Sequence, residues 1–482
     1  MIWAILLLGL LLRILNFNQS YWLDESIGVL AARDFSYSEL VRHFVKFDFH
    51  PPFHYVLLKF WGENFGFSEI STRSLSVLFG VGTIYVVYKI AQNLDLKKNT
   101  KFWRNWPIIV ALFLATSPLH IYYSQEVRMY PMVVFFACIS VLFYIKSVSN
   151  PVFYNWLIFS SAIVLLVFTD YVPLFLLPIF IVESLLNKRP RAFIIKLFLS
   201  HIPLFLFSLL WAQTFLAQIQ SGKALSISFS SWAKIVGSPS PKELVLVWIK
   251  FIIGRISFVN KVKYAALIII YSIPFLTTLI IAWLRKRKDT LILWLWLILP
   301  LILGYISSFI IPSFSYFRYI FVLPAFYLLL SFGVSKSGRL SIFLGSLILI
   351  VNIVSYYFYL TNKGFWREDW RAAVSFVESN ALQDEIVLFE FEEPFAPYKW
   401  YSSWKVTAKG GLKKIPAEEN STTNLIEDLI QNKGAVWYFI YLKDLTDPEG
   451  YLQKNILESG FGETEIFDFN GVGNVIYYKR SL

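Results

Sequence analysis

Long apolar stretches separated by short polar loops occupy the first 360 residues. A helix needs about 20 mostly apolar residues to cross the hydrocarbon core of a bilayer, and these stretches approach that length. The pattern therefore predicts an α-helical polytopic membrane protein with about eleven transmembrane helices. The predicted spans are 1–17, 73–91, 106–120, 129–146, 155–170, 171–187, 194–216, 264–284, 289–311, 317–334 and 340–360.

The first span is short enough to be a signal peptide. It lacks a basic start, however, and no cleavage site of small residues precedes Tyr21. A cleaved leader is expected to have a basic start and such a cleavage site. We therefore interpret 1–17 as a retained helix.

The pattern changes after residue 360, where short segments alternate between helical and strand periodicity. Residues 361–482 are predicted to form a small extracytoplasmic α/β domain, which we call the tail. The first domain, 1–360, is predicted to be a transmembrane domain with outer loops 18–72 and 217–263. The predicted helices of the tail are 370–379, 425–431 and 451–459, and its predicted strands are 385–390, 435–441, 463–469 and 474–479.

Composition excludes several classes of protein. The chain is 56% hydrophobic and only 16% charged, whereas a soluble domain carries about 25% charged residues. The tail holds 13 basic and 19 acidic residues, which leaves 31 basic and 13 acidic residues in 1–360. Positive charge thus accompanies the apolar part, as in a membrane protein with cationic loops, and we expect no nucleic-acid partner. The single cysteine, Cys138, excludes an intramolecular disulfide.

The positions of lysine and arginine predict the orientation of the helices. Basic residues concentrate in alternate short loops, and such loops face the cytoplasm. The alternation holds only if 244–258 does not cross the membrane, so we interpret this segment as an interfacial helix. The protein is then predicted to lie in the plasma (inner) membrane with the tail outside. The basic loops lie near 97–104, 146, 188–191, 285–288 and 336–339.

The first predicted outer loop opens with Tyr21-Trp22-Leu23-Asp24-Glu25. Two adjacent carboxylates at a membrane surface are costly if they are buried without partners. Asp24 could cap a helix that runs to Asp34, or it could act in acid–base chemistry. The two roles are compatible, and the sequence leaves both open.

The same loop continues with Asp48-Phe49-His50-Pro51-Pro52-Phe53-His54. A neutral histidine can donate to a phosphate oxygen or accept a proton. The alternative is an aromatic and histidine belt at the membrane interface. Because the two prolines make a shared helical face doubtful, we do not interpret His50 and His54 as a metal pair.

Three further motifs carry charge on the predicted outer side. Glu126 and Arg128 lie in a very short loop, where a carboxylate could hold a divalent cation and an arginine could grip a phosphate. They could instead be a charge pair that ties two loops together. Arg318 could reach lipid headgroups or face an anionic substrate. The segment 366–371 could be an interfacial anchor that leads into a capped helix.

Together these motifs resemble the bacterial membrane glycosyltransferases of the GT-C class. The resemblance is to the protein O-mannosyltransferase and aminoarabinose-transferase group in particular (glycosyltransferase family 39-like). Each motif is short, and the ordered set on one predicted membrane face carries the resemblance. The tail resembles the small α/β domains appended to many such enzymes. The matching pieces are Trp22-Leu23-Asp24-Glu25, His50-Pro51-Pro52-Phe53-His54, Ser124-Gln125-Glu126-Val127-Arg128-Met129-Tyr130, Arg318-Tyr319 and Asp369-Trp370-Arg371.

The resemblance implies an enzyme that moves a sugar from a polyprenyl-phosphate donor to an acceptor hydroxyl on the outer face. The acceptor is a glycan, a lipid or a protein, and membrane lipids surround the enzyme. The family's catalytic acid pair falls on Asp24 and Glu25. Asp24 is then the general base, Glu25 orients it or binds acceptor, and a single displacement inverts the anomeric centre.

The departing phosphate needs positive charge to stabilise it. Among the residues of the matching motifs, His50, Arg128 and Arg318 are the predicted phosphate ligands, with Tyr130 and Tyr319 also in the donor site. No cofactor is certain. A divalent metal, Mg or Mn, on Glu126 stays open because some proteins of this class need none.

Three other functions compete with this one. A transporter or lipid-linked-sugar flippase is expected to place ionisable groups in the middle of the membrane. Here the acidic residues outside the tail gather in the predicted outer loops instead. A scaffold that presents the tail leaves these polar residues without a purpose. A glycan polymerase of the same class stays open.

Overall fold

The computed structural model describes all residues except 95–100, 229–236, 238, 286–287 and 481–482. The described residues form two compact units. The first, which we call the helical unit, joins 1–17, 35–219 and 236–361. The second, the tail unit, joins 18–34, 220–235 and 362–482. The segment that carries Asp24 and Glu25 is therefore grouped with the tail.

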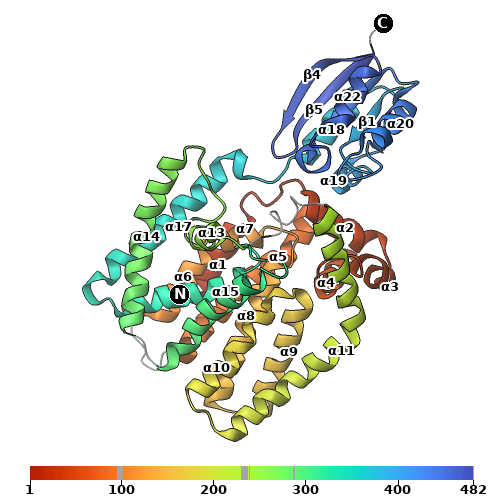
Figure 1. Ribbon diagram of the computed structural model, residues 1–482. Helices are drawn as coiled ribbons and strands as arrows, with labels where there is room; N and C mark the ends of the chain where they lie inside the picture. Colours follow the sequence, from red (N-terminus) through yellow and green to blue (C-terminus); the bar gives the residue numbers. More distant parts are fainter. Residues whose placement is uncertain (95–100, 229–236, 238, 286–287, 481–482) are drawn as a thin grey trace. The chain divides into compact units, whose positions relative to one another are not determined.

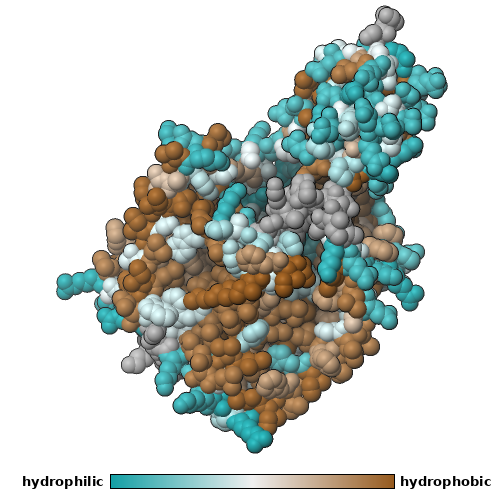
Figure 2. Space-filling view, in the orientation of Figure 1, coloured by the Kyte–Doolittle hydropathy of each residue, from teal (hydrophilic) through white to brown (hydrophobic). Residues whose placement is uncertain are grey.

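The helical unit consists of α-helices and short helical turns (Figure 1). Apolar side chains gather over these helices, whereas the surface of the sheet domain is mostly polar (Figure 2). The α-helices are α1 (Ile2–Ile14), α3 (Tyr37–Glu39), α4 (Phe53–Phe65), α5 (Glu69–Leu94), α6 (Trp106–Ala115), α7 (Pro118–Ser124), α8 (Tyr130–Ser149), α9 (Phe153–Thr169), α10 (Pro178–Leu186), α11 (Arg191–Ser228), α13 (Pro241–Ile253), α14 (Lys261–Leu284), α15 (Leu291–Ser307), α16 (Leu323–Lys336) and α17 (Ser341–Thr361). The short turns are η1 (Leu40–Val45), η2 (Phe102–Arg104), η3 (Val172–Leu176), η4 (Lys288–Thr290), η5 (Ile320–Val322) and η6 (Gly338–Leu340).

Six described helices are long and apolar enough to cross a membrane. There are seven if the bent pair α6 and α7 counts as one span. Four shorter apolar helices, Ile2–Ile14, Phe153–Thr169, Val172–Leu186 and Ile320–Lys336, coincide with further predicted spans. The helices show a membrane protein, but the predicted count of eleven spans is not confirmed.

A buried arginine supports the break between α6 and α7, which meet at 57°. Pro118 cannot donate a backbone hydrogen bond, so the break leaves carbonyl groups at the end of α6 without helical partners. Arg13 fills this gap by donating to the carbonyl groups of Leu114 (3.3 Å) and Ala115 (3.1 Å). The nitrogen that donates to Leu114, Nη2, also lies 2.7 Å from Nδ1 of His120. The single charge in the first helix therefore stabilises a distant break.

Helix α13 corresponds to the ambiguous segment 244–258. With 13 residues, it is too short to count among the candidate spans. Before α13, the carbonyl of Gly237 accepts from the N–H of Phe314 (3.1 Å). After it, Arg255 donates to the Tyr122 hydroxyl (3.2 Å). That this segment lies at the interface and does not cross stays a prediction.

The tail unit is built around a five-stranded sheet of order β2-β1-β3-β5-β4 (Figure 1). Strands β2, β1 and β3 are parallel, and Ile386 pairs with both Thr407 and Val436. Strand β5 is antiparallel to β3 and β4. The strands are β1 (Ile386–Phe389), β2 (Thr407–Gly410), β3 (Ala435–Phe439), β4 (Phe461–Phe469) and β5 (Gly473–Arg480). The helices and turns are α2 (Leu23–Asp34), η7 (Lys363–Phe365), α18 (Trp370–Asn380), α19 (Ala396–Tyr401), α20 (Glu419–Ile430), α21 (Lys443–Thr446) and α22 (Tyr451–Glu458).

Helices cover both faces of this sheet. Side chains of α18 and α19 pack on one face with Phe389 and Phe439, while α20 and α22 pack on the other with Leu388 and Tyr438. The four predicted strands and three predicted helices of the tail are present. Strand β2 was not predicted, because its sequence Thr-Ala-Lys-Gly lacks a run of apolar residues. Leu23 of α2 packs against the face formed by α18 and α19, so the first outer loop contributes to the core of the tail.

Candidate functional site

Ionisable residues form two clusters, one in each unit. The carboxylate cluster, in the tail unit, comprises Asp24, Glu25, Arg367 and Glu368. The cationic cluster, in the helical unit, comprises Asp48, His50, His54, Arg128, Arg255 and Arg318. Each cluster is described by itself.

Helix α2 positions the two acids of the first loop. The helix begins at Leu23, so Asp24 lies inside the first turn and is not the N-cap that the sequence left open. An Oε2 atom of Glu25 accepts from the N–H of Trp22 (3.4 Å), which lies just before the helix. Carboxylates are favoured here because the amino end of a helix carries partial positive charge. Asp24 is half-buried and Glu25 is fully buried.

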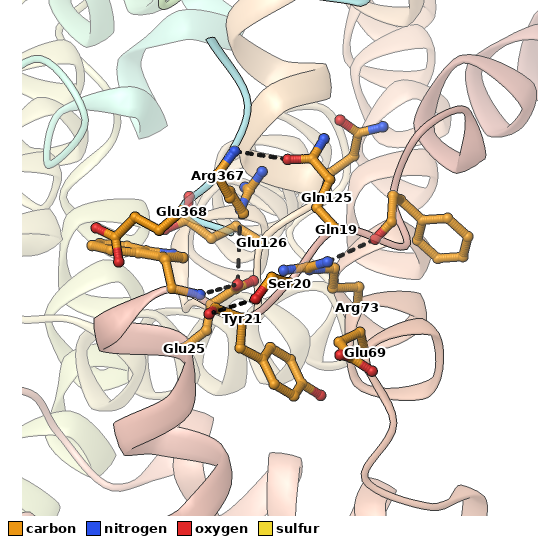
Figure 3. Close-up of polar contacts among 12 residues, drawn as sticks. Gln19, Ser20, Tyr21, Glu25, Glu69, Arg73, Gln125, Glu126, Arg367 and Glu368 are labelled. Carbon is orange, nitrogen blue, oxygen red and sulfur yellow. Dashed lines mark hydrogen bonds and ion pairs between the residues drawn. The ribbon is translucent and has the colours of Figure 1, made fainter. Parts of the chain in front are cut away.

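A buried ion pair holds Glu25. Nε of Arg367 lies 3.8 Å from Oε2 of Glu25, and the two side chains are 2% and 0% exposed. Figure 3 shows the two side chains pointing toward one another. The backbone N–H of Arg367 also donates to Oε1 of Gln19 (2.8 Å). Breaking a buried pair leaves an uncompensated charge, so each partner depends on the other.

Glu368 is the next residue. Its carboxylate accepts from Nε1 of Trp370 (2.7 Å) and from the Tyr441 hydroxyl (2.8 Å). Burial and the charge of Asp24 raise the pKa of Glu368 to about 7. The Trp370 and Tyr441 donors act in the opposite direction because they stabilise the charged form. The segment 366–371, interpreted from sequence as an anchor, thus surrounds the predicted acid pair.

In the helical unit, a turn before α4 pairs Asp48 with His50. Oδ2 of Asp48 lies 3.1 Å from Nδ1 of His50 and accepts from the Tyr55 hydroxyl (2.7 Å). Gln218 of α11 fixes the turn by donating to the carbonyl of His50 (3.0 Å). Burial favours the protonated form of Asp48, but His50, Tyr55 and Arg128 together hold its pKa well below the usual range. Asp48 therefore stays ionised and fixes one ring nitrogen of His50.

Arg128 is largely buried near this turn. Burial, together with the charges of Arg128 and His50, lowers the pKa of His54 to about 3. His54 is therefore neutral at physiological pH. The guanidinium carbon of Arg128 lies 6.0 Å from the centre of the Tyr130 ring. The structure thus brings together His50, Arg128 and Tyr130, three of the predicted donor-binding residues.

Aromatic rings extend this cluster. The Tyr130 ring packs edge-on against Phe317 with centroids 5.8 Å apart. The guanidinium of Arg318 lies 6.0 Å from the Phe317 ring, and Nε of Arg318 is buried without a hydrogen-bond partner among the described residues. Tyr130 and Arg318, which come from two distant motifs and are both predicted to bind the sugar donor, therefore contact the same phenylalanine ring.

Tyr319 occupies a different environment. Its side chain is fully buried, and its ring packs against Phe314 (4.8 Å) and Phe321 (5.9 Å). The ring also stacks on Phe175 at 6.5 Å. Tyr319 is thus part of the aromatic core, and its predicted part in the donor site stays a prediction.

Glu126 is also buried. Its backbone carbonyl accepts from the Ser76 hydroxyl (2.6 Å), and its charge acts on Arg255 and Tyr123. Over the described ranges, no group of three or more His, Cys, Asp or Glu side chains lies close enough to hold a metal ion. These surroundings fit an internal partner of Arg255 better than a metal ligand.

Sequence reasoning assigned no role to Arg255 and Glu368. Arg255 follows Gly254, which adopts a positive φ of 69° and packs against Pro118 and Leu119 of α7. Its guanidinium carbon lies 4.9 Å from the centre of the Tyr122 ring. The available signal was a lone Gly-Arg after an apolar helix. For Glu368 the signal was an acidic residue between Arg367 and Asp369, which is weak in isolation.

Comparisons with known proteins agree with this architecture. No protein-family model matches the sequence, and no curated protein matches it. Solved structures do match. ArnT from Cupriavidus metallidurans in the apo state has a TM-score of 0.57 at 11% identity, over 99% of this chain and 97% of that chain. The oligosaccharyltransferase of Archaeoglobus fulgidus, solved with Zn and sulfate, has a TM-score of 0.53 at 14% identity, over 99% and 73%.

A third similar structure is the arabinofuranosyltransferase AftD from Mycobacteria. Its TM-score is 0.51 at 13% identity, over 99% of this chain and 41% of that chain. These proteins share the fold of GT-C membrane glycosyltransferases. The chain therefore has the GT-C fold, and the resemblance in fold that its motifs predicted is confirmed. The predicted fold class, a helical membrane protein with a small C-terminal α/β domain, is confirmed as well.

Proposed function

We propose that this protein is an integral-membrane glycosyltransferase that uses a lipid-linked sugar as donor. The observation that carries the proposal is the half-buried Asp24 in the first turn of α2, next to the buried pair of Glu25 and Arg367, in a chain with the GT-C fold. An accessible carboxylate next to a fixed charge pair is suited to taking up a proton. The fold supplies the reaction class, and the cluster supplies a base.

Similar structures support the choice of donor. ArnT from C. metallidurans has been solved bound to undecaprenyl phosphate, with a TM-score of 0.55 at 11% identity. The oligosaccharyltransferase AglB from A. fulgidus has been solved with an inhibitory peptide and a dolichol-phosphate. We infer that a polyprenyl-phosphate sugar is the donor for this chain too. The acceptor is a glycan, a lipid or a protein.

In the proposed reaction, the acceptor hydroxyl gives its proton to the Asp24 carboxylate. The acceptor oxygen forms a bond to the anomeric carbon while the bond from that carbon to the phosphate oxygen breaks. The electron pair of the broken bond leaves with the polyprenyl phosphate. A single displacement of this kind inverts the anomeric centre. Glu25, held by Arg367, keeps the first turn of α2 in place during the transfer.

The cationic cluster is the proposed site for the donor phosphate. Arginine binds phosphate through two parallel hydrogen bonds, and developing negative charge on the departing phosphate is stabilised by donors that are already in place. Arg128 and Arg318 supply this charge, and His50 adds a donor at the ring nitrogen that Asp48 does not hold when both of its ring nitrogens carry protons. The packed rings of Tyr130 and Phe317 connect the two arginines.

A divalent metal enters no step of this proposal. Zn is present in the A. fulgidus oligosaccharyltransferase structure, but the described surroundings of Glu126 do not supply a set of metal ligands. Glu126 is proposed instead to balance the charge of Arg255.

The location of the reaction is also a proposal. The basic loops favour a cytoplasmic side opposite to the predicted outer loops, which carry the predicted site residues. Transfer is then proposed to occur on the extracytoplasmic face of the plasma (inner) membrane, where polyprenyl-linked sugars are presented.

A transfer assay tests the proposed function. Purified protein in nanodiscs would receive radiolabelled polyprenyl-phosphate sugars, with a crude membrane extract as acceptor. We expect transfer by the wild type and its loss in Asp24→Asn, with donor binding unchanged. Asp34→Asn is the matched control because Asp34 lies at the other end of α2, exposed and paired with Arg33.

Two outcomes would change the proposal. Transfer that survives in Asp24→Asn but is lost in His50→Gln would move the base to the Asp48–His50 pair, whose geometry suits general-base catalysis. Tight binding of the donor without transfer, combined with movement of the donor across the bilayer, would favour the flippase.

A further inference from the structure

Helix α11 presents three residues on one face to Tyr171. Trp211, Phe215 and Gln218 are spaced by four and three positions, so they lie on the same side of the helix. The Tyr171 ring packs edge-on against Phe215 with centroids 4.9 Å apart, and Nε1 of Trp211 donates to the Tyr171 hydroxyl (2.8 Å). Tyr171 is therefore fixed by α11 at both its ring and its hydroxyl group.

Both ends of the Gln218 amide are hydrogen-bonded. Its Oε1 accepts from the Tyr171 hydroxyl (2.6 Å). Its Nε2 donates to the carbonyl of Val45 (2.7 Å) and to the carbonyl of His50 (3.0 Å). The side chain is buried, where an amide without partners is costly. The orientation of the Gln218 amide is therefore determined by Tyr171 on one side and by two carbonyl groups on the other.

The two carbonyl groups that Gln218 binds lie at the two ends of the turn 45–50. Val45 is the last residue of η1, and His50 is followed by two prolines. A proline has no backbone N–H, so the chain around His50 has few local donors to close this turn. Gln218 supplies both donors from a helix position 168 residues away from His50. It thereby joins the start of the turn to its end.

Inside the turn, Asp48 and Gln218 do different things to His50. Oδ2 of Asp48 lies 3.1 Å from Nδ1 of His50 and orients the imidazole ring. The Tyr55 hydroxyl donates to the same oxygen (2.7 Å). Gln218 instead holds the backbone that carries both Asp48 and His50. Loss of the Gln218 hydrogen bonds would let this pair move as a unit without breaking its own bond.

We propose that Gln218 is a positioning residue for His50, which holds the turn 45–50 in the conformation that presents the Asp48–His50 pair to the donor phosphate. This inference rests on the proposed function, because it names the support of the proposed donor site. It also gives α11 a part in that site beyond residue 216, where the predicted span ends. Gln218 acts through His50 and is not itself a ligand of the phosphate.

The chain offers a matched control in Asn352, a second buried amide of the helical unit. Its Oδ1 accepts from the Tyr327 hydroxyl (3.3 Å), and its Nδ2 donates to the carbonyl of Phe113 (3.3 Å) and to the Thr116 hydroxyl (3.2 Å). These partners belong to α16 and to the end of α6, whereas those of Gln218 include the carbonyl of His50. A general role in the stability of the helical unit would affect both amides.

The first test is equilibrium binding of radiolabelled undecaprenyl phosphate to the full-length protein in nanodiscs. We expect Gln218→Met to raise Kd about 10-fold, because a displaced His50 makes a weaker hydrogen bond to the charged phosphate. Tyr171→Phe removes one hydroxyl, keeps the ring and should raise Kd about 2- to 3-fold. Asn352→Leu should leave Kd close to that of the wild type.

A double-mutant cycle shows whether Gln218 acts through His50. Substitutions of residues in one hydrogen-bond network have effects that do not add. Gln218→Met should therefore raise Kd much less in a His50→Gln background than in the wild type. An increase of equal size in both backgrounds would overturn the proposal. An equal increase in Asn352→Leu would overturn it too, because it would indicate a general loss of structure.

Hydrogen exchange separates this inference from the proposed function. Gln218→Met should increase amide exchange in the peptide that covers residues 43–50, and Asn352→Leu should not. If the wild type does not bind undecaprenyl phosphate, the proposed donor site fails, and the exchange data still decide whether Gln218 holds the turn. If exchange in this peptide is unchanged in Gln218→Met, Gln218 does not position His50, whatever the affinity for the donor.

Discussion

The two clusters contain buried carboxyl groups whose pKa values move in opposite directions. Asp48 faces His50 and Arg128, and these partners outweigh burial, so its pKa falls. Burial of Glu368 outweighs the effect of its two donors, Trp370 and Tyr441, and the charge of Asp24 adds to this, so its pKa rises to about 7. Pairs of groups whose surroundings separate their pKa values often divide the work of acid–base catalysis and charge stabilisation.

The two clusters also differ in construction. The cationic cluster is held by side chains from helices and short loops, with aromatic rings between the charges. The carboxylate cluster is held by backbone hydrogen bonds between two distant segments of the chain. The first arrangement suits a flexible anionic lipid headgroup. The second gives a carboxylate a fixed position, which proton transfer requires.

The largest expected effect comes from the carboxylate cluster. Asp24→Asn should lower kcat by about 10² to 10⁴, because the amide cannot take up the proton of the acceptor. KM for the donor should change little. Steady-state transfer kinetics measure both values, with Asp34→Asn as control. Equal activity of the two variants would remove Asp24 from the reaction.

A substitution in the cationic cluster should act on donor binding instead. Arg128→Gln should raise KM for the polyprenyl-phosphate sugar about 10- to 100-fold, because charge-assisted hydrogen bonds to phosphate are lost. Arg128→Lys should recover only part of this loss, since lysine cannot bind bidentately. Arg104→Gln, in a predicted cytoplasmic loop, serves as control. A purely kcat effect of Arg128→Gln would contradict its role in donor binding.

Glu390 sharpens the comparison because its raised pKa should affect stability and not catalysis. Burial raises its pKa to about 9, with a further contribution from Asp447. Because this value exceeds the ordinary 4.5, the folded protein binds this proton more tightly than the unfolded chain does. The resulting stabilisation of the folded state is complete below pH 4.5 and is lost as the pH rises through 9. In Glu390→Gln the free energy of unfolding should depend less on pH, by on the order of 1–3 kcal/mol across this range. Thermal unfolding from pH 5 to 9 measures it, and an unchanged pH dependence would show that Glu390 is not its source.

The smallest expected effect is at Arg255. Arg255→Gln removes a hydrogen bond to Tyr122 and a cation–π contact, each of which contributes about 1 kcal/mol. We expect a several-fold rise in KM for the donor and a smaller change in kcat. Tyr122→Phe is the paired variant, because it removes the hydrogen bond and keeps the ring. If Tyr122→Phe weakens donor binding as much as Arg255→Gln, the hydrogen bond matters and the cation–π contact does not.

Much of the fold could be predicted because its signals are local. The apolar runs lead to the helices of the helical unit, and periodicity locates seven elements of the tail. The motifs around Asp24, His50, Arg128 and Arg318 are also local. Periodicity could not predict which apolar helices are long enough to cross a bilayer. Helices α9 and α16 lie in two predicted spans, but both belong to the shorter apolar helices and not to the six that are long enough. The site residues stay predictions that the kinetic experiments above test.

Local sequence determined that this chain is a helical membrane protein with an α/β tail, and it located the acid pair and the basic motifs. Only the tertiary structure decided that residues 18–34 fold with the tail, that Arg13 supports the break after α6, and that Arg367 pairs with Glu25. These features join residues more than 100 positions apart, or more than 300 in the case of Arg367. Hydrogen bonds over such distances depend on how the chain closes in space, and no pattern of neighbouring residues encodes that.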